Sequence, residues 1–317
     1  MMNKNEFINY EKAKVEEMLA ENYDGEIKVT PVTVVKMNDQ KVNGLSVSLD
    51  GSNVCPTIYL DDAYAAYSEG ENPDLIAKRV ADQIMEASIK APKIESEKKA
   101  PDLSDKPIAL RLLEISRNKE FLQDVPYMSV GNGLALVCDI RIQQRDEGYY
   151  SAVVNNNLLQ SLGRDRIDVF REALNNAWET DRPVLCSMES KLFGGADVNL
   201  LDNPMPVESG MYILSNTSSI HGAAALFYPD VQEKISEALG DNYYALPSST
   251  EEFIIVPECT GISHKELSDM VHNANRTVVD PGQVLSDSVL KYDREKGYLQ
   301  DVSCGRDLSD RVSETRC

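Results

Sequence analysis

Hydrophobic residues recur every three to four positions in two segments near the N-terminus, a spacing that predicts amphipathic helices. The first helix is expected over residues 4–19 and the second over residues 73–89. Asn72 and Pro73 give the second helix an N-cap and a proline at its first helical position. We therefore expect each helix to bury one face against a common core.

Between these helices the pattern becomes that of strands. Residues 27–36 are rich in Val and Thr, residues 45–49 alternate apolar side chains with Ser, and residues 55–60 form a third candidate. A short helix is expected directly after the third strand. The order helix, three strands, helices predicts a small α+β unit over residues 1–90.

Residues 91–106 interrupt both patterns. They contain four Lys, four acidic residues and two Pro, with almost no apolar side chains. This composition is typical of a solvated linker, and we expect trypsin to cut there first. Residues 303–317 are also poor in apolar side chains and are expected to form a flexible tail.

Residues 107–302 mix both periods, which predicts a second and larger α+β unit. Helices are expected at 157–162, 165–178, 229–239 and 263–275. Strands are expected at 108–114, 133–142, 149–154, 211–215, 222–227, 243–246, 252–257, 288–292 and 298–302. Segment 211–257 is expected to form the centre of the core of this unit. The whole pattern predicts an α+β protein with mixed, mostly antiparallel sheets and packed helices in two units.

Charge and composition narrow the classes of partner. The chain has a formal net charge of -20, which disfavours binding to nucleic acid because a surface this acidic repels phosphate groups. It has only three His, and its six Cys show no close pair, so neither a metal site nor a bound cofactor is expected. No run approaches the about 20 apolar residues of a membrane span, so a cytoplasmic protein with no membrane contact is expected.

Two polar loops are the candidates for a functional site. Asn216 and His221 flank a run of hydroxyl residues that could frame a pocket, although the same residues suit a tight turn between strands. Ser248 and Ser249 lack the Gly-x-Ser-x-Gly context of a nucleophilic serine, and a turn or a cap is the simpler interpretation.

A third arrangement places a thiol near a histidine. Cys259 precedes His264 by five residues, a spacing that permits contact across a loop. A Cys–His nucleophile needs a third group to orient the imidazole, and the neighbouring sequence offers none. His264 and His272 are eight residues apart on the predicted helix, about 12 Å along its axis, too far to share one ion.

Several segments together resemble a known family. They are Gly51-Ser52-Asn53, Pro56–Leu60, Asn118, Val125-Pro126, Met211–Asn216, Gly222–Ala224, Leu246–Ser249, Met270-Val271, Asn275–Val278 and Val284–Asp287. Over nearly its whole length the chain resembles the bacterial family catalogued as domain of unknown function 5688, and the resemblance implies no activity. Thr250-Glu251 stand where this family often has a histidine after the paired serines, which argues against a catalytic role for that position.

Two functional hypotheses follow from these patterns. The first is a non-enzymatic module that binds an unknown protein partner, because the sequence has no metal cluster, nucleotide loop or complete triad. The alternative is an enzyme, such as a hydrolase, whose site is assembled from distant residues including Asn216, His221 or Ser248. A concave pocket lined by those residues would favour the enzyme, and a broad exposed apolar patch would favour the binding module.

Overall fold

The computed structural model divides the chain into two compact units, Met1–Asp102 and Leu103–Cys317. It describes residues 1–50, 57–90, 103, 105–145, 148–194, 198–204 and 210–303. Of the expected linker 91–106, only residues 103, 105 and 106 belong to the described part, and of the expected tail 303–317 only Ser303 does. Antiparallel sheets and helices occur in both units, so the predicted α+β class is confirmed.

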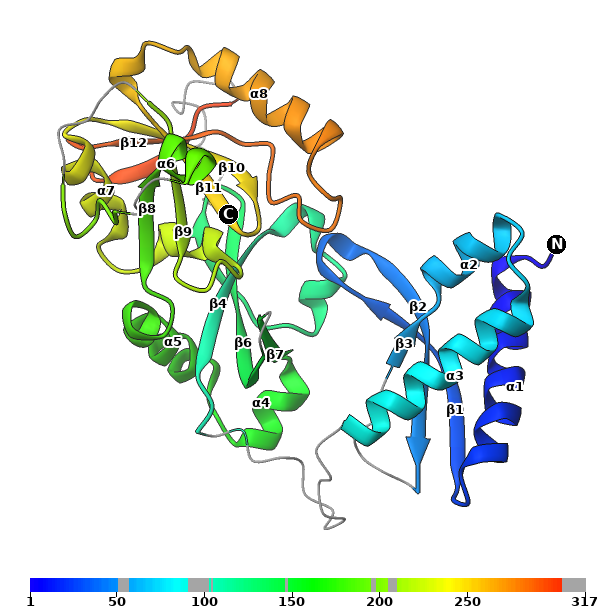
Figure 1. Cartoon of the computed structure of the whole chain (residues 1–317). Coiled ribbons are helices and arrows are strands. Elements are labelled where there is room, and N and C mark those ends of the chain that lie inside the picture. The colour runs from blue at the N-terminus through cyan, green and yellow to red at the C-terminus, as the bar shows by residue number, and fades with distance from the viewer. Residues whose placement is uncertain are drawn as a thin grey trace, which may run out of the picture. The chain divides into compact units, whose positions relative to one another are not determined.

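The first unit packs helices against one small sheet (Figure 1). The sheet is antiparallel in the order β1-β2-β3. The elements of this unit are α1 (Lys4–Asn22), β1 (Ile27–Val35), η1 (Met37–Asp39), β2 (Lys41–Leu49), β3 (Thr57–Tyr59), α2 (Asp61–Ser68) and α3 (Pro73–Lys90). Asn3 and Glu6 form a capping box that fixes the start of α1. Phe7, Leu45 and Ile76 lie in the buried core, one from each of three elements.

The second unit contains two antiparallel sheets. One has the order β13-β12-β10-β11-β9-β8, and in the other β6 pairs with β4, β5 and β7. The strands are β4 (Ile108–Glu114), β5 (Met128–Gly131), β6 (Leu134–Arg145), β7 (Gly148–Val153), β8 (Pro183–Ser187), β9 (Tyr212–Asn216), β10 (Tyr243–Ser249), β11 (Glu252–Pro257), β12 (Leu290–Asp293) and β13 (Tyr298–Asp301).

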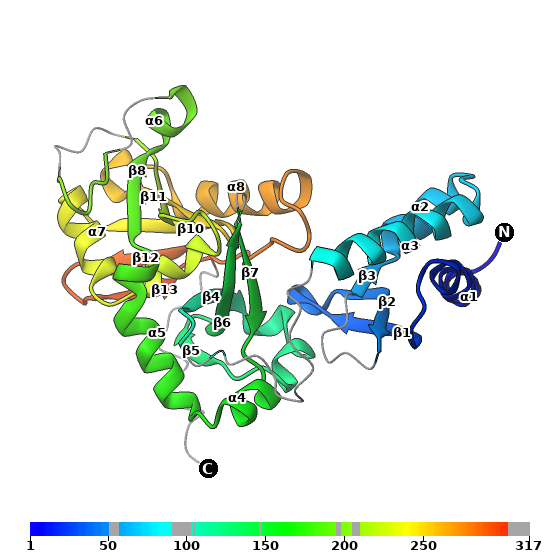
Figure 2. The same cartoon turned by 60° about the horizontal axis from the view of Figure 1, so that its bottom comes forward.

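Helices cover both faces of the six-stranded sheet (Figures 1 and 2). Side chains of α8 pack with Tyr244 and Leu246 of β10 on one face, while α7 packs with Tyr243 and Ala245 on the other. The helices of this unit are η2 (Ile115–Arg117), η3 (Phe121–Gln123), α4 (Asn156–Leu162), α5 (Arg166–Thr180), α6 (Met188–Phe193), η4 (Gly222–Phe227), α7 (Val231–Leu239), η5 (Glu258–Thr260) and α8 (His264–Thr277).

Strand β6 has two faces of different character. Leu136, Cys138 and Ile140 lie in the main core, where Cys138 is beside Phe170 of α5. Because side chains alternate along a strand, Asp139 and Arg141 point to the opposite face. This alternation places two charged residues in the interior of the unit, where both are buried.

The expected strand 222–227 is wrong, because this segment forms the 3-10 helix η4. Its glycine and alanines allow a close approach that larger side chains would prevent. A Cβ atom on Gly222 would lie 2.1 Å from Ser215 Oγ and 2.4 Å from the backbone oxygen of Glu251. The apolar run therefore packs as a compact turn against the sheet and does not extend it. The short elements β5, β8 and α6 were not predicted from the sequence.

Segment 211–257 was expected to lie at the centre of one core, but its residues pack into two clusters. Phe253 and Ile255 are fully buried in the main core, but Ile254 is half-buried on the opposite face, in a smaller cluster with Leu267 and Val271 of α8. The segment therefore faces two separate cores, because alternate residues of β11 point to opposite sides of the sheet.

In the part of the chain that the structure describes, no helix is both long and apolar enough to cross a membrane.

Candidate functional site

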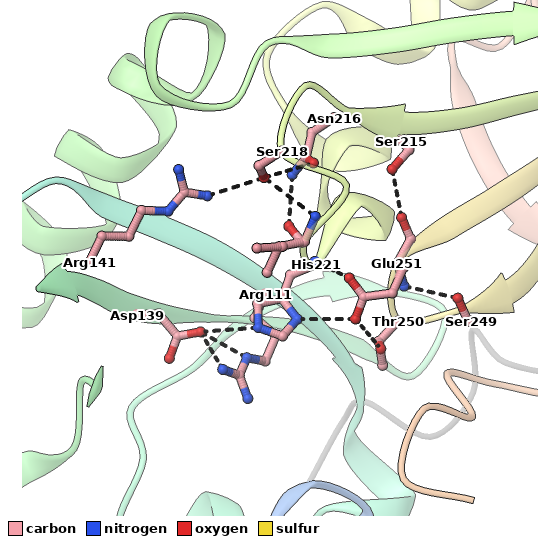
Figure 3. A network of polar contacts seen from close by, with 11 residues as sticks. Arg111, Asp139, Arg141, Ser215, Asn216, Ser218, His221, Ser249, Thr250 and Glu251 are labelled. Carbon is pink, nitrogen blue, oxygen red and sulfur yellow. Dashed lines mark hydrogen bonds and ion pairs between the residues drawn. The ribbon is translucent and has the colours of Figure 1, made fainter. Parts of the chain in front are cut away.

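Two of the three candidate loops meet in the second unit. Asn216 ends β9, His221 is the residue before η4, and Ser249 ends β10 where the chain turns toward β11. Strand β11 pairs with both β9 and β10, so the ends of these strands lie side by side. Figure 3 shows the resulting polar network, with Glu251 of the turn directed at the ring of His221.

His221 lies between two carboxylates. Its Nδ1 atom is 3.6 Å from Glu251 Oε1, and its Nε2 atom is 3.7 Å from Asp139 Oδ2 (Figure 3). Its backbone N–H also donates a hydrogen bond to Glu251 Oε2. The side chain is 22% exposed and the backbone has a φ of 54°, a left-handed conformation that is uncommon for a residue with a side chain. Nδ1 has no hydrogen-bond partner among the described residues, so its contact with Glu251 is longer than a hydrogen bond.

Asp139 is held by a guanidinium from the neighbouring strand. Arg111 of β4 is opposite Val137, and Asp139 is two residues further along β6, so the two side chains are diagonal neighbours on one face. Asp139 Oδ2 accepts from Arg111 Nε at 2.8 Å and from Arg111 Nη2 at 2.5 Å. The aspartate is 2% exposed, and its Oδ1 atom has no hydrogen-bond partner among the described residues.

A second buried ion pair lies beside the first. Arg141 Nη2 donates to Asp181 Oδ2 at the C-terminal end of α5, and it is 3.5 Å from Ser218 Oγ. Burial raises the pKa of Asp181 above its usual value, even though Arg141 and Ser218 act in the opposite direction. Asp181 Oδ1 also has no hydrogen-bond partner in the described part of the chain.

The 216–220 loop is closed by its own side chains. Asn216 Nδ2 donates to the backbone oxygen of Ile220 at 2.9 Å, and Ser218 Oγ donates to Asn216 Oδ1 at 3.1 Å. Asn216 is buried and its amide is used within the loop. This asparagine therefore positions His221 and is not directed at solvent.

The two serines have different surroundings. Ser249 Oγ accepts from the backbone N–H of Glu251 at 3.1 Å, which stabilises the turn that carries this glutamate. Ser248 Oγ donates to Glu252 Oε1 at 3.2 Å, away from the network. Among the described residues, no hydroxyl or thiol forms a hydrogen bond with His221. The structure thus brings together Asn216, His221 and Ser249 but not Ser248.

His221 stabilises the ionised form of Glu251. Burial raises the pKa of the Glu251 carboxyl, but the ring and the backbone N–H of His221 outweigh it and hold the pKa below its usual value. Thr250 Oγ1 donates to Glu251 Oε1 at 3.0 Å and acts in the same direction. Glu251 thus joins the turn to the start of η4 through the backbone N–H and the ring of His221, and we call this contact the Glu251 clasp.

Sequence reasoning missed four charged members of the network: Arg111, Asp139, Arg141 and Asp181. A usable signal existed for three of them. Each interrupts an otherwise apolar strand, in the runs Ile108–Leu113 and Leu134–Ile142. A charge on a buried strand requires a partner, so such interruptions indicate a site. Asp181 ends a helix and gives no such signal.

The thiol–histidine candidate does not form a reactive pair. The carboxylate of Asp241 accepts a hydrogen bond from the thiol of exposed Cys259, which raises the thiol pKa and so opposes thiolate formation. His272 Nδ1 is 2.8 Å from the backbone oxygen of Ser268 on its own helix. No group of three or more His, Cys, Asp or Glu side chains within the described ranges could hold a metal ion.

Comparison with known proteins gives one match. Residues 4–294 match the sequence profile of the Family of unknown function (DUF5688). No curated protein matches the chain. No solved structure matches it either.

Proposed function

The chain belongs to the DUF5688 family, and we propose that it is a non-enzymatic interaction module that binds a partner or ligand without transforming it. One observation carries this proposal. Both ring nitrogens of His221 face carboxylates, Glu251 on one side and Asp139 on the other. A general base needs one nitrogen directed at a substrate or a nucleophile, and this geometry supplies none.

The network is well suited to hold a binding unit rigid. It joins β4, β6, the 216–221 loop and the 249–251 turn (Figure 3), and the Arg141–Asp181 pair adds the end of α5. These segments are far apart in the sequence. Buried ion pairs contribute little net stability, but they tolerate only one arrangement of their partners. The unit would therefore present its surfaces in a fixed conformation, which lowers the entropy lost on binding.

A second function, hydrolysis, is favoured by a different observation. Polar residues from distant segments converge on His221, and both Ser219 and His221 have left-handed backbone conformations, with φ of 54° for each. Strained residues of this kind cluster at active sites. In this alternative a rotation of the imidazole away from Glu251 would free Nδ1 to act as a base.

Covalent labelling separates the two functions. The full chain is incubated with a fluorophosphonate, and labelled serines and threonines are mapped by mass spectrometry. A binding module should show no labelling at Ser215, Ser218, Ser249 or Thr250 beyond that of heat-denatured protein. Labelling at one of these positions that disappears in His221→Gln, but persists in His272→Gln on the exposed face of α8, would establish the hydrolase and overturn the proposal.

A further inference from the structure

A groove on the second unit lies apart from the charged network. It runs between α5 and β5, has a volume of about 260 Å³, and can be located in Figure 2 from the labels of these two elements. Its lining residues are Met128, Arg166, Ile167, Phe170, Arg171 and Leu174.

The groove follows one stripe of α5. Ile167, Phe170, Arg171 and Leu174 have the i, i+3, i+4, i+7 spacing of a single helix face. Phe170 is anchored in the main core, whereas Ile167 is 64% exposed. An isoleucine this exposed beside a phenylalanine gives the groove an apolar floor that water covers poorly.

The charged residues that line the groove are both arginines. Two arginines line it and no acidic residue does, in a chain whose net charge is -20. Arg171 shares an exposed ion pair with Asp168, with Nη1 2.6 Å from Oδ1. Arg166 forms no ion pair with any residue that the structure describes. An apolar floor bordered by an uncompensated guanidinium fits a ligand with an apolar body and one negative charge.

We propose that this groove binds an amphipathic monocarboxylate, an aliphatic or aromatic body carrying a single carboxylate. The body lies on Ile167, Phe170 and Leu174, and the carboxylate accepts hydrogen bonds from Arg166. The inference rests on the proposed function, since it names the class of ligand that the second unit binds.

Size and charge favour this class over larger anions. A volume of about 260 Å³ lies just below the usual range of ligand sites, roughly 300–1,000 Å³, so only a small ligand fits. A stable protein interface buries on the order of 1,000 Å² or more, far beyond what this groove offers. A polyanion would also be repelled by the rest of the acidic chain, whereas one carboxylate meets the arginines with little such penalty.

Calorimetric titration of the full chain with octanoate tests the proposal. Octanoate should bind with one site per chain and a dissociation constant tighter than about 1 mM. Octanamide has the same body without the charge, and octylammonium has the opposite charge. Both should bind at least about fivefold more weakly, because they lose the charge-assisted hydrogen bond.

Variants locate the site. Arg166→Gln should weaken octanoate binding about two- to fivefold without changing octanamide binding. Ile167→Ser should weaken the binding of both ligands, and the unit should stay folded because this residue is exposed. Arg182→Gln is the matched control, since Arg182 is an exposed arginine of the same unit that does not line the groove. Equal effects of Arg166→Gln and Arg182→Gln, or no octanoate binding at 1 mM, would overturn the proposal.

Binding and labelling measurements on the same protein distinguish a wrong class of ligand from a wrong proposed function. Absence of octanoate binding together with absence of fluorophosphonate labelling rejects the monocarboxylate and leaves the binding module intact. Hydrolysis of p-nitrophenyl octanoate that depends on His221 rejects the binding module, whatever octanoate binding shows.

Discussion

Each unit holds a glutamate that is shielded from solvent, fully for Glu11 and partly for Glu251, and the two differ in what surrounds the carboxyl group. Glu11 on α1 is 0% exposed in the core of the first unit, and neither of its carboxyl oxygens has a hydrogen-bond partner among the described residues. Burial, reinforced by the charge of Asp74, raises the pKa of Glu11 to about 7 against the opposing charge of Arg79. Glu251 in the second unit contacts His221, and its pKa lies below the usual value. Burial alone therefore favours a neutral carboxyl, whereas a nearby cation or donor keeps it ionised.

The aspartates of the second unit extend this contrast. Asp139 and Asp181 are as deeply buried as Glu11, but each lies against a guanidinium, Arg111 and Arg141 respectively. Glu11 has no hydrogen-bond partner among the residues described, whereas both aspartates are paired with arginines, although burial still raises the pKa of Asp181 in spite of its pair. We therefore expect neutralising substitutions and changes of pH to shift the free energy of unfolding of the two units in opposite directions.

Loss of a buried guanidinium should have the largest effect on the free energy of unfolding. Arg141→Met leaves Asp181 buried without its cation and should lower the free energy of unfolding of the second unit by about 3–5 kcal/mol. The only tryptophan of the chain, Trp178, lies on α5, so its fluorescence during urea unfolding reports on this unit. Asp181→Asn in the same chain removes the uncompensated charge and should recover part of the loss. A double variant no more stable than Arg141→Met would show that the charge is not the cause.

Neutralising Glu11 should have a smaller effect of the opposite sign. The folded-state pKa of about 7 exceeds the ordinary value of 4.5, so this group favours folding most below pH 4.5 and loses that contribution as the pH rises through 7. At pH 8 the parent must ionise a buried carboxyl, and Glu11→Gln should stabilise the first unit by about 3 kcal/mol. At pH 4 most of this gain should vanish.

Hydrogen exchange of amides in α1 and α3, followed by mass spectrometry at both pH values, measures this change. The Trp178 transition provides the internal control, because it reports on the other unit and should not move. A gain of equal size at pH 4 and pH 8 would mean that the side chain acts through packing and not through ionisation.

The Glu251 clasp should give a still smaller effect in the acid range. Its folded-state pKa is below 4.5, so its contribution is complete above pH 4.5 and is lost as the pH falls through the folded value. Glu251→Gln should cost about 1 kcal/mol at pH 6 and nothing once the parent carboxyl is protonated. The parent and variant Trp178 unfolding curves should therefore converge as the pH falls below 4.5 and through the folded-state pKa. Curves that stay parallel over this range would place the acid-labile group elsewhere.

The fold was predicted from the sequence where a periodic pattern decided the structure. The expected helix 165–178 corresponds to α5, and 108–114 coincides with β4, because one buried face imposes a regular spacing. The strand predicted for segment 222–227 was wrong because Gly and Ala are compatible with both a strand and a tight turn. The choice depends on the close approach of Gly222 to Ser215, a tertiary contact that no local pattern contains.

Only those parts of the site that lie next to one another in the sequence could be predicted. The small and hydroxyl residues around His221 indicated a constrained loop, and this loop does lie at the network. The partners of His221 could not be predicted, because Asp139 is brought to it by the register of β6 with β4 and by the packing of η4 against that sheet. Pairing across such sequence separations is fixed by tertiary structure and not by spacing.

The smallest effect should come from an exposed pair with the same chemistry as the buried one. Arg182 follows Asp181 directly and pairs with Asp202, with Nη2 2.6 Å from Oδ1, but its side chain is 52% exposed, against 8% for Arg141. Water can replace the lost partner of Asp202, so Arg182→Met should cost less than about 1 kcal/mol. Raising the salt concentration to about 1 M should shrink this cost further while leaving that of Arg141→Met nearly unchanged, because screening acts on exposed charges. Both variants are compared by urea unfolding followed through Trp178 fluorescence. If they destabilised the second unit equally, burial would not be what makes the Arg141 pair sensitive, and the contrast between the two glutamates would lose its physical basis.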